Sequence, residues 1–128
     1  MSTTAYATVL AWQDALSTGD LDTLLELSSD GIEIAGDHGG GQGLTVLDQW
    51  ASETHTTMKP QRIYARGALV VTESIAEGSV TPSEEPSTRT VAAAFQVVGD
   101  QVGSVFVHPD LPAAFAATGL GDGDLVED

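Results

Sequence analysis

The stretch 17–50 (STGDLDTLLELSSDGIEIAGDHGGGQGLTVLDQW) constrains the fold of this chain more than any other part. Asp20 is a good N-cap for a short helix, because its carboxylate accepts hydrogen bonds from free amides of the first turn. Leucines recur at helical spacing as far as Leu27, and Gly31 is expected to end this helix in the left-handed conformation. Apolar and polar residues then alternate over 32–35, which is typical of a strand.

The second half of this stretch predicts a loop and another helix. Residues 37–43 (DHGGGQG) include four glycines and are expected to form a flexible loop. Thr45 and Asp48 have the spacing of a capping box, in which two side chains satisfy free amides at the start of a helix. The apolar positions that follow, Trp50 among them, are expected to form the buried stripe of that helix.

The rest of the chain predicts one helix before this stretch and several strands after it. A helix is predicted over 5–17, where Trp12 lies on an apolar stripe and faces the core, while Gln13 lies off the stripe. Strands are predicted over 61–66, 68–76, 88–98 and 101–108, and a short helix within 109–120. Three helices before a run of strands with short turns predict an α+β domain with a mostly antiparallel sheet.

Length and composition predict a single domain over 1–120, followed by an acidic tail, 121–128, that is expected to be mobile. The N-terminus lacks the pattern of a secretory signal, and no apolar run is long enough to span a membrane, so a cytoplasmic protein is expected. Nineteen acidic residues against four basic ones give a net charge of −15. Such a charge repels nucleic acid and anionic membrane surfaces, so we expect neither as a partner.

Four segments together resemble one known superfamily. They are the end of the opening helix at 15–22 (ALSTGDLD), the helix at 24–27, the strand at 32–37 and the turn into a helix at 43–50. In this order they resemble the SnoaL-like or nuclear-transport-factor-2-like superfamily. The resemblance implies a cystatin-like cone, in which three N-terminal helices pack on a curved, mostly antiparallel sheet around an internal pocket. It also implies a homodimer formed through the outer face of the sheet.

The catalytic patterns of two enzyme groups in this superfamily are not matched. Ketosteroid isomerases need a carboxylate base and an oxyanion hole made by a tyrosine and a protonated aspartic acid. The corresponding positions here fall on Gly36, Trp12 and Ala93. The epoxide hydrolases use an Arg-x-Asp pair on a strand, whereas the run 89–91 (RTV) has the arginine without the acid.

Other side chains remain candidates for acid–base chemistry. Asp37 and His38 stand side by side after a predicted strand, where this fold opens its pocket, so either could act as a general base; the alternative is an ordinary polar loop. Glu73 shares a strand face with apolar residues such as Val71, where a carboxylate needs a partner. It is expected either to pair with an arginine across the sheet or to be the acid inside the cavity.

The predicted pocket is lined by the aromatic residues Trp12, Trp50, Tyr64 and Phe95. The three histidines are widely separated along the chain, so no metal site is expected. The glycine loop lacks the order of a phosphate-binding motif, and no cofactor is expected. The sequence therefore predicts a protein that binds a small hydrophobic molecule. The alternatives are an acid–base enzyme acting on a hydrophobic carbonyl or polyketide-like substrate, and a dimeric interaction module without a ligand.

Overall fold

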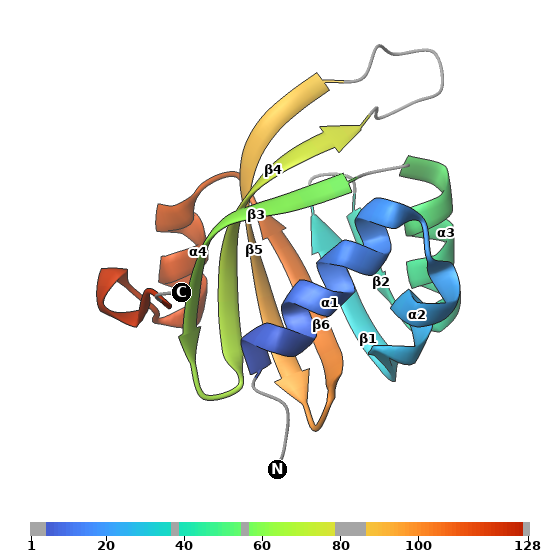
Figure 1. Cartoon of the computed structure of the whole chain (residues 1–128), viewed down its shortest axis with the longest axis horizontal. Coiled ribbons are helices and arrows are strands. Elements are labelled where there is room, and N and C mark those ends of the chain that lie inside the picture. The colour runs from blue at the N-terminus through green and yellow to red at the C-terminus, as the bar shows by residue number, and fades with distance from the viewer. Residues whose placement is uncertain (1–4, 37–38, 55–56, 79–86, 127–128) are drawn as a thin grey trace.

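The computed structural model describes residues 5–36, 39–54, 57–78 and 87–126 (Figure 1). Within them lie four α-helices: α1 (Ala5–Thr18), α2 (Leu21–Glu26), α3 (Leu44–Thr54) and α4 (Leu111–Thr118), with a short 3-10 helix η1 (Asp122–Asp124). The strands are β1 (Ser28–Gly36), β2 (Gly39–Gln42), β3 (Thr57–Arg66), β4 (Leu69–Gly78), β5 (Ser87–Val98) and β6 (Gln101–His108). No helix among these residues is long and apolar enough to cross a membrane.

The six strands form one sheet in the order β2-β1-β6-β5-β4-β3. Every neighbouring pair is antiparallel except β1 and β6, which run parallel. In Figure 1, α1 lies across one face of the sheet, with α2 and α3 beside it near β1 and β2. The fourth helix, α4, packs against β4, β5 and β6. The expectation of helices packed on a mostly antiparallel sheet is therefore confirmed, and α4 adds a helix after the last strand.

Side chains of the sheet alternate between two separate apolar cores, as the period of a strand requires. The inner layer, under α1, α2 and α3, includes Val70 and Ala76 of β4. The outer layer, under α4, includes Val71 and, at its edge, Leu69. Strand β4 therefore has apolar residues on both faces.

The boundary between α2 and β1 differs from the prediction. Helix α2 ends at Glu26 with Leu27 as its C-cap, and Gly31 lies inside β1. Strand β1 pairs with β6 from Ser28 onward, and the amide of Val102 donates to the carbonyl of Leu27 at 2.7 Å. Sheet pairing therefore begins immediately after the helix and leaves no room for a glycine-ended turn.

The predicted glycine loop is also partly wrong. Its residues 39–42 form β2, which pairs antiparallel with β1. Glycine is needed at Gly41, because a Cβ atom there would lie 2.8 Å from Cγ1 of Val46 on α3. Helix α3 then begins at Leu44, so Thr45 lies inside the helix and does not form the predicted capping box. Asp37 and His38 lie outside the described residues.

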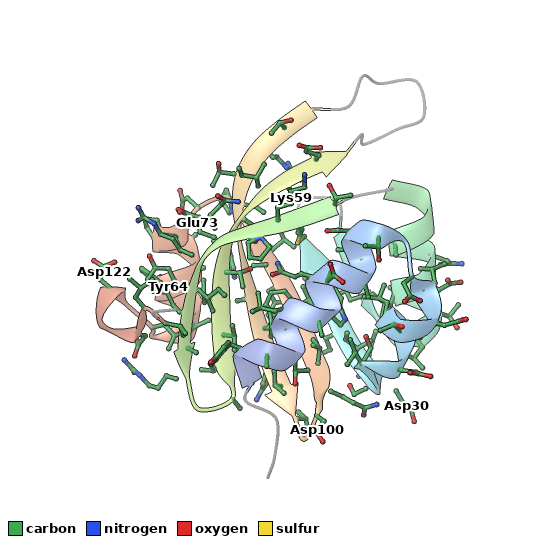
Figure 2. The ribbon with its side chains drawn as sticks, in the orientation of Figure 1. Asp30, Lys59, Tyr64, Glu73, Asp100 and Asp122 are labelled. Atoms are coloured by element: carbon green, nitrogen blue, oxygen red, sulfur yellow. The ribbon has the colours of Figure 1, made fainter. Side chains whose placement is uncertain are left out.

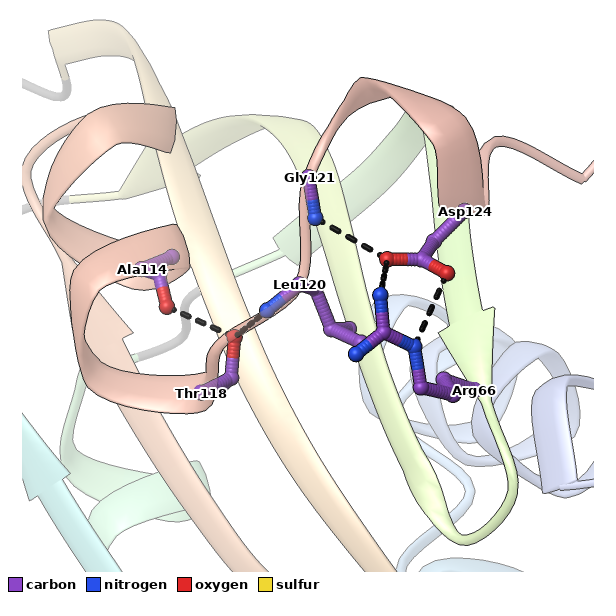
Figure 3. A network of polar contacts seen from close by, with 6 residues as sticks. All are labelled: Arg66, Ala114, Thr118, Leu120, Gly121 and Asp124. Carbon is purple, nitrogen blue, oxygen red and sulfur yellow. Dashed lines mark hydrogen bonds and ion pairs between the residues drawn. The ribbon is translucent and has the colours of Figure 1, made fainter.

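The structure places residues 121–126 of the acidic tail against the edge strand β3 (Figure 3). The mobility expected of this tail stays a prediction. Arg66 donates from Nε and Nη2 to the two carboxylate oxygens of Asp124, at 3.1 and 2.7 Å. Asp124 also accepts from the amide of Gly121 at 3.0 Å. Further along, the amide of Val126 donates to the carbonyl of Ile63 at 2.7 Å, so the tail continues the sheet pairing by one step.

Candidate functional site

The inner layer contains one fully buried amide side chain, that of Gln13 on α1. Its Nε2 donates to the hydroxyl oxygens of Thr72 at 3.0 Å and Ser74 at 3.2 Å, both on β4. The same nitrogen lies 3.8 Å from the sulfur of Met58 on β3. The carbonyl oxygen Oε1 of Gln13 is buried and accepts no hydrogen bond from the described residues. We call Gln13, Met58, Thr72 and Ser74 the inner polar cluster.

The prediction that Gln13 lies off the buried stripe of α1 is wrong. The stripe includes Val9, Trp12 and Leu16, all buried, and Gln13 follows Val9 by four residues, which places it on the same face. The helical period alone would have found this position. The polarity of Gln13 argued against a buried position, because glutamine is mostly exposed in folded proteins.

An unsatisfied buried carbonyl is unfavourable, at about 1–3 kcal/mol for a polar group without its partner. Such groups in native proteins call for an explanation, and a bound water or ion is a common one. The hydroxyls around Gln13 do not supply the missing donor: Ser74 donates to Thr72 at 3.1 Å. The carbonyl oxygen of Gln13 is therefore the atom of this cluster that can accept a hydrogen bond from a molecule that reaches it.

A groove lies on the surface between α1 and β3, with a volume of about 470 Å³. Its lining residues are Leu10, Asp14, Ser17, Thr18, Met58, Lys59 and Pro60. Met58 belongs both to this lining and to the inner polar cluster. Met58 therefore connects the lining of the groove to the inner polar cluster.

Two of the predicted pocket residues meet in the inner layer. Trp12 and Phe95 are buried, and their rings pack edge to face with centroids 5.5 Å apart. The indole nitrogen of Trp12 donates to the hydroxyl of Ser28 at 2.9 Å, which fixes the ring in the core. The side chain of Trp50 lies outside the part of the structure that is described.

Tyr64 and Glu73 lie on the other face of the sheet from Trp12 (Figure 2). Tyr64 therefore does not line a pocket together with Trp12. Glu73, expected either to pair with an arginine across the sheet or to be the acid inside the cavity, does not face the inner layer. Tyr64 is buried under α4, where its ring packs edge to face on Phe115 with centroids 5.0 Å apart. Glu73 is half-buried on β4, opposite Arg62 on β3 and Ala92 on β5. Strand alternation is the reason, because Tyr64 pairs with Val71 and both point away from α1.

The outer layer has a smaller cavity of about 150 Å³ near α4. It is lined by Leu69, Ala94, Phe95, Gln96, Ser104, Phe106, His108, Ala117 and Thr118. Nε2 of His108 is buried and has no hydrogen-bond partner within the described residues. Among those same residues, no three histidine, aspartate or glutamate side chains are grouped closely enough to hold a metal ion.

No protein-family model and no curated protein matches the chain. Solved structures do. An NTF2-like protein of unknown function from Cytophaga hutchinsonii has a TM-score of 0.75 at 14% identity, covering 90% of this chain and 97% of that one. An LEH-like epoxide hydrolase from M. tuberculosis has a TM-score of 0.72 at 23% identity, with coverage of 90% and 89%.

A third similar structure is a protein with a ketosteroid isomerase-like fold from Catenulispora acidiphila, solved in complex with trimethylamine. Its TM-score is 0.69 at 18% identity, and the match covers 89% of this chain and 93% of that one. At such identities these likenesses show the fold alone, since one fold carries many functions. The chain thus has the nuclear-transport-factor-2-like cone fold that its sequence resemblance implied.

Proposed function

We propose that this protein binds a small, largely apolar molecule in the inner layer between α1 and the sheet, and that Gln13 is the polar group that recognises it. The observation that carries this proposal is the carbonyl oxygen of Gln13, which is buried without a donor from the described residues. Ligand sites in proteins are typically apolar with a few well-placed polar groups. Trp12, Phe95 and Met58 supply the apolar surroundings here.

A purely structural role explains this glutamine less well. A leucine at the same position would continue the apolar stripe and leave no buried polar group without a partner. Instead, Nε2 of Gln13 is held by Thr72 and Ser74, which orients the amide and leaves its oxygen without a donor from the described residues. A ligand that donates to this oxygen would complete the arrangement.

The acid–base enzyme remains a second candidate, favoured by the fold shared with an epoxide hydrolase. Within the described residues, the buried polar side chains of the inner layer and its helices are hydroxyls and one amide: Thr8, Gln13, Ser28, Thr72 and Ser74. Asp37 and His38, which lie outside the described residues, therefore stay the predicted general bases of this candidate. The complex of the Catenulispora acidiphila protein with trimethylamine supports small-molecule binding by this fold.

Binding can be tested by titrating the isotope-labelled protein with a library of small soluble fragments and following its NMR signals. We expect some fragments to shift the signals of Thr72 and Met58, and Gln13→Leu to abolish those shifts. Gln96→Leu is the matched control, because Gln96 is exposed on the opposite face of the sheet. Fragments that bind Gln13→Leu as well as they bind the unmodified protein would contradict the proposal.

A homodimer through the outer face also remains a proposal, and the structure restricts where it could form. Helix α4 covers the outer face over Tyr64, Val71, Ala92 and Ala94. Phe106 on β6 keeps 36% of its surface exposed, and it pairs with Ala35 on β1. The strip formed by β6 and β1 is therefore a part of the outer face that a second copy could contact beside α4.

A further inference from the structure

We infer that the side chain of Met58 is the gate between the surface groove and the inner polar cluster, and that the ligand admitted is a neutral molecule with an O–H or N–H donor on an apolar body. This inference rests on the proposed function, because it names the entry route and the ligand class of the same site. It follows from how Met58 is held and from the chemistry of the atoms behind it.

Met58 is the residue that the groove lining and the inner polar cluster share. It lines the groove, yet only 3% of its surface is exposed. Its sulfur lies 3.8 Å from Nε2 of Gln13. Moving this one side chain toward solvent would join a groove of about 470 Å³ to the buried amide.

The backbone of Met58 is held by α1 on one side and by β4 on the other. Ser17 on α1 donates from its hydroxyl to the carbonyl of Met58 at 3.0 Å and accepts from the amide of Met58 at 3.1 Å. On the other side, Met58 pairs with Ala76 of β4. Methionine is unbranched and has three rotatable side-chain bonds, so it adapts to a changed space without a change in the backbone. These features allow the gate to open while α1 stays attached to β3.

The ligand class follows from the free atom behind the gate. Oε1 of Gln13 is an acceptor, so its partner has to be an O–H or N–H donor. The buried polar side chains around it in the described residues carry no charge, so a charged ligand would lose its hydration without a counter-ion. At the groove, Asp14 and Lys59 carry opposite charges, so the rim favours neither sign. A neutral donor fits this site best.

The ligand class can be tested with four small probes of similar size: 1-butanol, methyl propyl ether, n-butylammonium and butyrate. The readout is the methyl signal of Met58 after methionine labelling, since the chain has only two methionines, Met1 and Met58. We expect 1-butanol to bind about tenfold more tightly than the ether, because only the alcohol donates to Gln13. Equal binding of the ether, or tighter binding of either ion, would overturn the ligand class.

The gate is tested by the rate of association of 1-butanol, taken from the line shape of the side-chain amide signal of Gln13, because the Met58 variants lack the Met58 methyl group. Met58→Ala should speed association several-fold, whereas Met58→Leu, which keeps the volume of the side chain, should not exceed the unmodified protein. An unchanged rate in Met58→Ala would overturn the gate. If that variant does not fold, methyl relaxation dispersion on the unmodified protein decides: exchange of the Met58 methyl is expected, and its absence during binding would overturn the gate.

These outcomes are separable from a failure of the proposed function. Binding that depends on Gln13 but not on Met58 would leave the function standing and remove the gate. Probes that shift no inner-layer signal in either the unmodified protein or Met58→Ala would remove both.

Discussion

At the scale of single residues, Gln13 is the position where stability and function are expected to conflict. Its amide lies in an apolar core, and its oxygen has no donor from the described residues. Binding sites often keep such unfavourable groups because the ligand satisfies them. The same reasoning predicts what happens when the amide is removed.

Gln13→Leu should raise or preserve the free energy of unfolding of the ligand-free protein, by up to about 1 kcal/mol, while abolishing ligand binding. The hydroxyls of Thr72 and Ser74 remain bonded to each other in this variant, so little is lost. Urea titration measures the change. A loss of stability above about 2 kcal/mol would mean that the amide is chiefly a structural group.

Gly41 offers a second prediction at this scale. Gly41→Ala should destabilise the protein by about 1–3 kcal/mol, because the new Cβ atom would lie 2.8 Å from Cγ1 of Val46. Gly123→Ala is the control, since a Cβ atom there meets nothing within 4 Å. Shortening the obstructing side chain with Val46→Ala should recover part of the loss in thermal unfolding. Equal effects of Gly41→Ala and Gly123→Ala would contradict the close approach of α3 to β2.

At the scale of elements, the C-terminal segment is attached to β3 by one ion pair and one strand-like contact. The amide of Gly121, together with Arg66, lowers the pKa of Asp124 below its ordinary value of 3.8. A carboxyl group with a lowered folded pKa stabilises the attached form above the ordinary value, and that contribution is lost as the pH falls through the folded pKa.

We therefore expect the segment to detach below pH 3.8, before the core unfolds. Hydrogen exchange at the amide of Val126, which donates to Ile63, reports the attachment. Asp124→Asn should weaken protection of this amide already at neutral pH and flatten its dependence on pH, whereas Asp122→Asn should leave both unchanged. Full protection of Val126 in Asp124→Asn would show that the strand-like contact holds the segment alone.

At the scale of the whole molecule, α4 divides the outer face into a covered part and an open strip. If the protein dimerises through this face, Phe106→Arg should convert the dimer to a monomer, because it places a charge in an apolar contact. Light scattering after size-exclusion chromatography measures the mass. Gln61→Arg, at an exposed position on β3, is the control. A monomer in the unmodified protein would exclude the proposed dimer.

Much of the architecture was predictable from periodicity. The helical stripe of α1 is a local pattern that gave the buried face for Trp12, and the alternation of β4 placed Val71 on the same face as Glu73. The strand β2 was not predictable in this way, because its glycines favour no regular structure and pair only when β1 is beside them. The contact between the tail and β3 was not predictable for a similar reason. Asp124 and Arg66 are far apart in the sequence and come together only in the folded molecule.

The candidate site was harder to predict, because it depends on which face of the sheet each strand presents. Trp12 and Phe95 were expected together and are in contact. Tyr64 was expected in the same pocket, but the alternation of side chains along β3 places it on the opposite face of the sheet. The position of Gln13 in the helix indicates a buried side chain, whereas its polarity indicates an exposed one, and the structure follows the position. Asp37, His38 and the side chain of Trp50 stay as predictions.

The most direct test of the inner-layer site follows the side-chain amide signals of the glutamines during a titration with 1-butanol. The chain has no asparagine, so every such signal comes from glutamine, and Gln42, Gln61, Gln96 and Gln101 serve as internal controls on the surface. The account predicts that the signal of Gln13 shifts and saturates while those of the controls stay in place. A shift of Gln96 beside the outer cavity, with Gln13 unmoved, would contradict it.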